Sequence, residues 1–313
     1  MPGMTLYDKL VASHEVARID DEHILLYVDL HIMNEYTSPQ AFSGLAARGR
    51  AVLRPGQQMA VVDHIIPTHP VPSALRVIAD DASSRQALNL KHNCDAQRIA
   101  LFDTTDPLQG IEHVIAPEHG MILPGMVVLC GDSHTTTYGA LGALGFGIGT
   151  SEVEHILATQ TLVYRVARNM RVRVDGVLGA GVSAKDLVIY LVHRIGAQGA
   201  RGHAVEFCGA AIDALSAEAR MTLCNMTVEA GARAALIAPD ATTDAYVTAH
   251  APHLRGEALR AARGYWATLR TDDGAAFDVE HVFNAADIAP FVTWGTSPDQ
   301  AAEAAQKIVD ERL

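Results

Sequence analysis

Three side chains capable of acid–base chemistry follow one apolar run of the sequence. Asp132, Ser133 and His134 come shortly after residues 126–130, which a Pro-Gly turn sets off as a buried strand. An acid, a hydroxyl and an imidazole at a strand end are well placed to meet a ligand over the edge of a sheet. Asp-Ser before a glycine-rich stretch can also simply cap a helix or form a turn.

A second apolar run repeats this pattern. Residues 59–62 read as a strand that delivers Asp63 and His64 at its end. Taken alone, His64 is more typical of a structural or surface histidine. Two strand ends that each carry an acid and an imidazole favour a common site where the strands meet.

Two further stretches carry candidate groups. Residues 110–115 read as a short strand, in which Glu112 and His113 point to opposite faces, so that only one of them faces a site. Asn225 and Glu229 are four residues apart and would share one face of a helix. A salt bridge or a capping role also explains that second pair.

The order of the elements predicts an α/β fold. Strands and helices alternate along the chain, which is typical of layered α/β domains. The alternating strand that begins near residue 171 predicts two domains, residues 1–170 and residues 171–313. Helices are expected at 6–14, 153–163 and 184–195, and the Ala-rich tail, 300–313, predicts a C-terminal helix.

Composition and charge narrow the class of protein. The chain has 313 residues, of which 49% are hydrophobic and 19% charged, as in soluble globular proteins. Its net charge of -12 argues against nucleic acid as a partner, because phosphate binding needs a basic face. The sequence has no apolar run long enough for a membrane span and no secretory signal pattern, which predicts a cytoplasmic protein.

The cysteines do not form a metal-binding motif. The chain has four, Cys94, Cys130, Cys208 and Cys224, without a CxxC pair, and the last three stand in apolar contexts. Their spacing predicts buried free thiols, and we assign no metal ligand.

A set of motifs, in order along nearly the whole chain, resembles one family. The strings are TSPQAF at 37–42, DH at 63–64, LPGM at 123–126, GDSH at 131–134, GIGTSEVEH at 147–155, RMTLCNM at 220–226, LIAPD at 236–240 and VTWGT at 292–296. With these the chain resembles the large subunits of 3-isopropylmalate dehydratase (isopropylmalate isomerase), in the aconitase superfamily. The resemblance implies aconitase-type three-layer α/β/α domains.

The resemblance also implies roles for particular residues. Three carboxylate–imidazole pairs would surround the substrate: Asp63 with His64, Asp132 with His134, and His113 with Glu229. Gln40 and Ser133 would donate hydrogen bonds to substrate carboxylate, and Asn225 would lie close to the cofactor. The implied activity is that of a hydro-lyase on a substituted malate such as isopropylmalate, in leucine biosynthesis, with a small subunit as partner.

One departure from the family is large. Its [4Fe-4S] cluster is held by three cysteines, one in a Ser-Cys-Thr-Asn string and two in a CxxC pair, and these strings are absent from this sequence. The chain is therefore expected to need a cluster-bearing domain and a small subunit. An exposed apolar surface is expected where that domain would dock, which can drive self-association. The alternative is a short, cluster-free paralogue that serves as a binding or assembly subunit or as a metal-independent diacid lyase.

Overall fold

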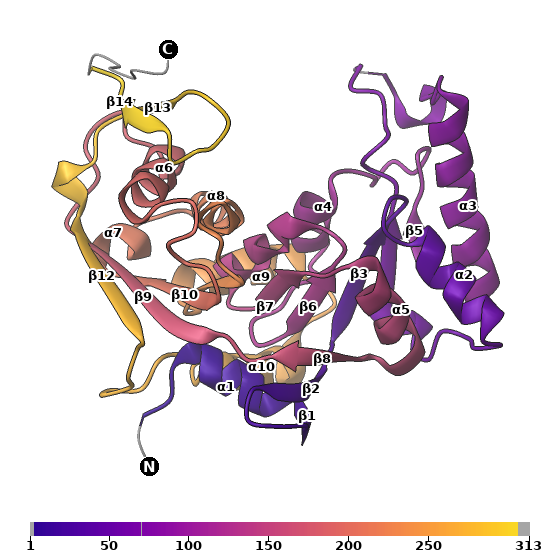
Figure 1. The fold of residues 1–313 in the computed structure, drawn as a ribbon, viewed down its shortest axis with the longest axis horizontal. Coiled ribbons are helices and arrows are strands. Elements are labelled where there is room, and N and C mark those ends of the chain that lie inside the picture. The colour runs from indigo at the N-terminus through magenta and orange to yellow at the C-terminus, as the bar shows by residue number, and fades with distance from the viewer. Residues whose placement is uncertain (1–2, 70, 306–313) are drawn as a thin grey trace.

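A five-stranded parallel sheet forms the centre of the first half of the chain. The computed structural model describes residues 3–69 and 71–305 (Figure 1). The sheet has the order β5-β4-β3-β6-β7 and consists of β3 (Leu30–Asn34), β4 (Gln58–Val61), β5 (Ala100–Phe102), β6 (Val127–Cys130) and β7 (Leu144–Gly147). The chain order reverses between β3 and β6. Open α/β sheets bind ligands at the carboxyl ends of the strands beside such a reversal.

Helices cover both faces of this sheet. Alternate strand residues such as Met33, Ala60 and Leu129 pack in one apolar cluster with α2 (Pro39–Ala47), α3 (Asp81–Gln97) and α5 (Thr150–Thr159). Residues of opposite orientation, such as Ile32 and Val61, pack with α4 (Glu112–Glu118) and the 3-10 segment η3 (Ser133–Leu141). This arrangement confirms the predicted α/β fold with its three layers.

A four-stranded parallel sheet organises the second half. Its order is β11-β10-β9-β12, with β9 (Arg168–Asp175), β10 (His203–Cys208), β11 (Ala234–Ile237) and β12 (Val279–Asn284). Strand β8 (Thr161–Arg165) closes a small antiparallel sheet with β1 (Glu15–Arg18) and β2 (His23–Tyr27), then leads directly into β9 (Figure 1). The division at residue 170 stays a prediction, and that residue lies inside β9.

The remaining elements connect and cover these sheets. They are α1 (Leu6–His14), α6 (Ala184–Ile195), α7 (Ala210–Asp213), α8 (Ala217–Met226), α9 (Ala241–His250), α10 (Gly256–Trp266), the hairpin strands β13 (Phe291–Thr293) and β14 (Ala301–Glu303), and the 3-10 segments η1 (Pro55–Gln57), η2 (Ser73–Leu75), η4 (Thr227–Ala230) and η5 (Ala285–Asp287). Helices α1 and α6 have the predicted bounds. No helix in residues 3–69 or 71–305 is long and apolar enough to cross a membrane.

Two expected elements are wrong in type. Residues 112–118 form helix α4 rather than part of the strand expected at 110–115. The buried residues Glu112, Ile115 and Ala116 of this helix follow a helical period, which the six residues of the expected strand were too few to show. In the expected C-terminal helix, residues 301–303 pair as β14 with β13, because strand pairing overrides the helix propensity of alanine. Residues 306–313 lie outside the described part.

Two helices end earlier than expected. Helix α5 ends at Thr159, because Gln160 takes a left-handed conformation and β8 follows. Helix α8 ends at Met226, so Glu229 lies in η4 and does not share a helix face with Asn225.

The two halves meet where η3 packs against β11. One apolar cluster joins Phe146 and Val153 of the first half to Leu236 and Trp266 of the second. At the contact itself, a Cβ added to Gly139 of η3 would overlap the carbonyl oxygen of Ala235. The backbones of η3 and β11 therefore approach more closely than any side chain would allow.

We expect the substitution Gly139→Ala to destabilise the fold by about 2 kcal/mol or more, because the backbone of β11 must shift to admit the new methyl group. Urea unfolding monitored by circular dichroism measures this loss. Gly56→Ala is the matched control, since a Cβ there meets nothing within 4 Å. Equal stability of the two variants would contradict the close contact.

Candidate active site

The candidate residues meet at the carboxyl ends of three adjacent strands. Glu35 follows β3, Asp63 and His64 follow β4, and Asp132 follows β6. Since β4, β3 and β6 are neighbours in one parallel sheet, their ends open onto the same edge. The two strand ends singled out in the sequence, and the glutamate after the strand between them, therefore meet at the reversal of strand order.

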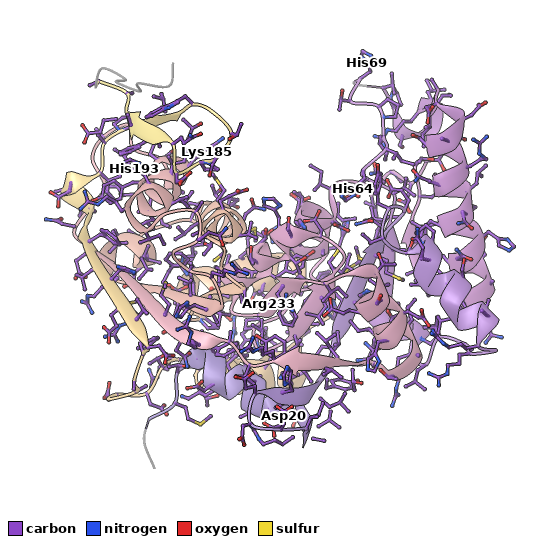
Figure 2. All side chains as sticks on the ribbon, in the orientation of Figure 1. Asp20, His64, His69, Lys185, His193 and Arg233 are labelled. Atoms are coloured by element: carbon purple, nitrogen blue, oxygen red, sulfur yellow. The ribbon has the colours of Figure 1, made fainter. Side chains whose placement is uncertain are left out.

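His64 lies between two carboxylates. Its Nδ1 donates to Oδ1 of Asp63 at 2.5 Å, and its Nε2 is 3.4 Å from Oδ2 of Asp132. Hydrogen bonds with Asp132 and Asp63 raise the pKa of His64 to about 11. His64 is therefore an imidazolium at neutral pH, and Figure 2 shows it beside α4, on the upper side of the molecule.

Asp132 is the acceptor on which several donors converge. Its Oδ1 accepts from Nε2 of His113 at 2.9 Å and from the backbone N–H of His134 at 2.7 Å. Burial alone would raise the pKa of Asp132, but hydrogen bonds from His113 and His64 outweigh burial and hold that pKa far below its usual range. Asp132 thus stays ionised and fixes two imidazoles at once.

Glu35 ties the loop after β4 to β3. Its fully buried carboxylate accepts from the backbone N–H groups of Asp63, at 3.3 Å, and of His64, at 2.8 Å. Burial raises the pKa of Glu35. Asp63 in turn accepts from the backbone N–H of Glu112 at 2.8 Å, which joins the start of α4 to the same loop.

Helix α4 turns two adjacent residues into the site, contrary to the strand expectation. His113 binds Asp132 through Nε2, and its Nδ1 is 3.1 Å from the hydroxyl of Tyr138. Glu112 is 1% exposed, and a single cluster brings ligand atoms of Glu112, His64 and Asp132 within 4.8 Å of one another. The expectation that only one of Glu112 and His113 faces the site is therefore wrong, and the helical spacing of the buried residues was the signal that could have shown it.

His134 and Glu229 bring the two halves together at the site. Nε2 of His134 is 3.4 Å from Oε1 of Glu229, whereas its Nδ1 is 3.8 Å from Asp132. The pairing implied by the resemblance is therefore exchanged: Asp132 hydrogen-bonds to His113, and Glu229 faces His134. The reason is that η3 directs the ring of His134 towards η4, so that His134 hydrogen-bonds to Asp132 through its backbone N–H and not through its ring.

The other expected residues lie at different places around this centre. Ser133 is exposed, with its hydroxyl 3.2 Å from Nδ1 of His134. Asn225 donates from Nδ2 to the hydroxyl of Thr137 at 2.9 Å, which holds α8 against η3. Gln40 is exposed in the first turn of α2. Their roles towards a ligand stay predictions.

A pocket next to Asp132 is lined by an arginine side chain, Arg233, which was not among the residues predicted from the sequence. Asp132 and Ser133 line it together with Ile148, Val228 and Arg233. The guanidinium of Arg233 lies 4.3 Å from the centre of the Phe146 ring and donates to the carbonyl of Gly147 at 3.1 Å (Figure 2). A fixed arginine beside a pocket suits a carboxylate ligand.

The thiols of the chain do not fit an iron–sulfur cluster. They lie on four different elements, α3, β6, β10 and α8, and burial raises the pKa of each; for Cys94 it reaches about 12. Cluster ligands must be thiolates, which these environments disfavour. The assignment of no metal ligand around His64 stays a prediction.

Comparison with known proteins places the chain in a family. Residues 8–312 match the model of the aconitase family (aconitate hydratase), and the chain belongs to that family. It is 54% identical over 301 residues to the 3-isopropylmalate dehydratase large subunit 2 of Salmonella choleraesuis (strain SC-B67), covering 96% of this chain and 63% of that protein. It is 51% identical over 312 residues to the large subunit 1 of that enzyme in Mannheimia succiniciproducens, covering 99% and 65% respectively. The chain thus spans a little under two thirds of the length of these relatives.

We expect Asp132→Asn to lower the pKa of His64 from about 11 towards 6.5, because one of its two anionic partners is lost while Asp63 remains. Because the folded pKa is the higher one, the stability gained from protonated His64 is full below about pH 6.5 and is lost as pH rises through about 11. Nitrogen-15 NMR of the imidazole measures the titration directly, and Asp95→Asn on the exposed side of α3 is the control. An unchanged titration of His64 in Asp132→Asn would contradict the contact.

Proposed function

We propose that this chain provides the acid–base side of a hydro-lyase that acts on a substituted malate such as isopropylmalate, as in leucine biosynthesis. One observation carries the proposal: the imidazole of His64 is held between Asp63 and Asp132 at the reversal of strand order in an α/β sheet. The family membership and the names of the two relatives support the reaction class.

The geometry suits the removal of water from a hydroxy-diacid. Hydroxide is a poor leaving group, so its C–O bond breaks readily only if a proton arrives on the oxygen. We infer that His64 gives that proton, which leaves as part of the water molecule while the neighbouring carbon loses its own proton to a base and a C=C bond forms. Asp63 and Asp132 keep the imidazole charged and aimed until transfer.

The surrounding residues take supporting roles in this proposal. His113 orients Asp132, and the pair of His134 with Glu229 closes the site from the second half of the chain. Ser133 and Gln40 would donate to a substrate carboxylate. Asn225 would stand near a cofactor, beside the contact of α8 with η3.

We further propose that turnover requires parts beyond these residues. A small subunit would supply the base for the carbon proton, since both relatives are named large subunits. A [4Fe-4S] cluster would act as a Lewis acid on the hydroxyl, held by cysteines other than the four described here. The alternative is a cluster-free paralogue that serves as a binding or assembly subunit or as a metal-independent diacid lyase, and the contacts of His64 with Asp63 and Asp132 fit that alternative as well.

We expect His64→Gln to reduce kcat by about 100-fold to 10,000-fold in the assembled enzyme, the range for loss of a general acid. The glutamine keeps polarity and similar length but cannot carry the proton. Steady-state hydration of isopropylmaleate measures the effect, with His92→Gln on the exposed side of α3 as control. A variant with near-normal kcat would remove His64 from the chemical step.

Anaerobic iron–sulfur reconstitution tests the need for a cluster. The purified chain is treated with and without a small subunit, and iron content, visible spectrum and hydration of isopropylmaleate and citraconate are measured. We expect no stoichiometric cluster and no turnover from the chain alone. A cluster with turnover would show that its own cysteines bind iron, whereas turnover without iron would establish the cluster-free lyase.

A further inference from the structure

The proposed reaction leaves one buried acid of the site without a role. Glu112 is 1% exposed in the first turn of α4, and its carboxylate lies within 4.8 Å of ligand atoms of His64 and Asp132. The sequence gives this position no function. A buried carboxyl group is costly unless it is paired or protonated, so its environment needs an explanation.

The carboxyl group of Glu112 has weak partners only, among them the thiol of Cys130, which is a weak hydrogen-bond donor. Nδ2 of Asn34 is 3.4 Å from each of its oxygens, and Nε2 of His113 is 3.8 Å from Oε1, beyond hydrogen-bond distance. The backbone N–H of Glu112 donates to the carboxylate of Asp63 and does not compensate the charge of the Glu112 side chain. These contacts do not compensate for the burial of a full negative charge.

Acidic neighbours make ionisation harder still. The titratable groups that surround Glu112, from α4, the loop after β4, β6 and η3, are His113, Asp63, His64, Cys130, Asp132 and Tyr138. Asp63 and Asp132 repel a further negative charge, and the imidazoles are already engaged by them. Burial first, and then this repulsion, raise the pKa of Glu112 to about 7.

We propose that Glu112, by holding or releasing a proton, sets how strongly the site accepts a dianionic hydroxy-diacid. The identity of that ligand rests on the proposed function. A protonated Glu112 adds no charge to the site, whereas an ionised one adds a negative charge next to Asp63 and Asp132, where the dianion must bind. Glu112 is thus a positioning residue for substrate charge and takes no part in the bond-breaking step.

The direction of the pH effect follows from linkage. Below neutral pH Glu112 is protonated and affinity is highest. As pH rises through about 7, the ionised form, which binds about tenfold more weakly, takes over, so KM rises by about tenfold in total and then levels off. By reciprocity, a bound dianion must make Glu112 harder to ionise. Replacing Glu112 by the neutral isostere glutamine abolishes both effects and leaves KM flat over this range.

Carbon-13 NMR of the chain with labelled glutamate carboxyl groups tests the inference without any need for turnover. The signal lost in Glu112→Gln identifies the group, and Glu118→Gln, exposed on the same helix, is the control. We expect the Glu112 signal to titrate near pH 7. It should move up by about one pH unit with saturating isopropylmalate, a tenfold preference for the protonated form, and not with sulfate at equal ionic strength.

Titration of Glu112 near pH 4.5, or a midpoint that isopropylmalate leaves unchanged, would overturn the inference. In the assembled enzyme, so would an equal rise of KM with pH in Glu112→Gln and in the wild type. A midpoint that rises with isopropylmalate in the chain, together with an assembled enzyme that does not turn isopropylmalate over, would support the inference and refute the proposed hydro-lyase activity.

Discussion

The site depends on the attachment of one imidazolium to two carboxylates from different strands. Asp63 comes from the end of β4 and Asp132 from the end of β6, and these strands are separated in the sheet by β3 alone. His64 reaches both because Glu35, at the end of β3, holds the backbone of the loop that carries it. The strand order, the buried glutamate and the charge on His64 therefore form one constraint.

That constraint explains why the second half of the chain must pack closely against the first. The 3-10 segment η3 carries Asp132 at its start and Gly139 further along, where β11 approaches its backbone. Any displacement of β11 would be transmitted along η3 towards Asp132, and it would also move η4 with Glu229. The absence of a side chain at Gly139 thus contributes to the position of two carboxylates that it does not contact.

The sequence predicted the strand ends well, because an apolar run followed by Asp-His or Asp-Ser-His is a local pattern. It failed at residues 110–115, where a short apolar run looked extended, although the buried positions of residues 112–118 follow a helical period. It could not show which carboxylate faces which imidazole, because the exchange between Asp132 and Glu229 depends on how η3 is oriented between two sheets. Arg233 was missed for the same reason, because it is distant in sequence from Asp132 and Ser133, with which it lines the pocket.

Burial sorts the carboxyl groups of the site into two kinds. Asp132 is half-buried and receives hydrogen bonds from two imidazoles, so its ionised form is favoured, whereas Glu112 is buried with only a weak amide donor and a thiol donor, so its neutral form competes near neutral pH. Side chains of the same chemistry thus acquire different charges within one cluster. Both kinds suit the proposed binding of a dianion beside an imidazolium, because a buried acid that is neutral does not add to the repulsion between the carboxylates and the ligand.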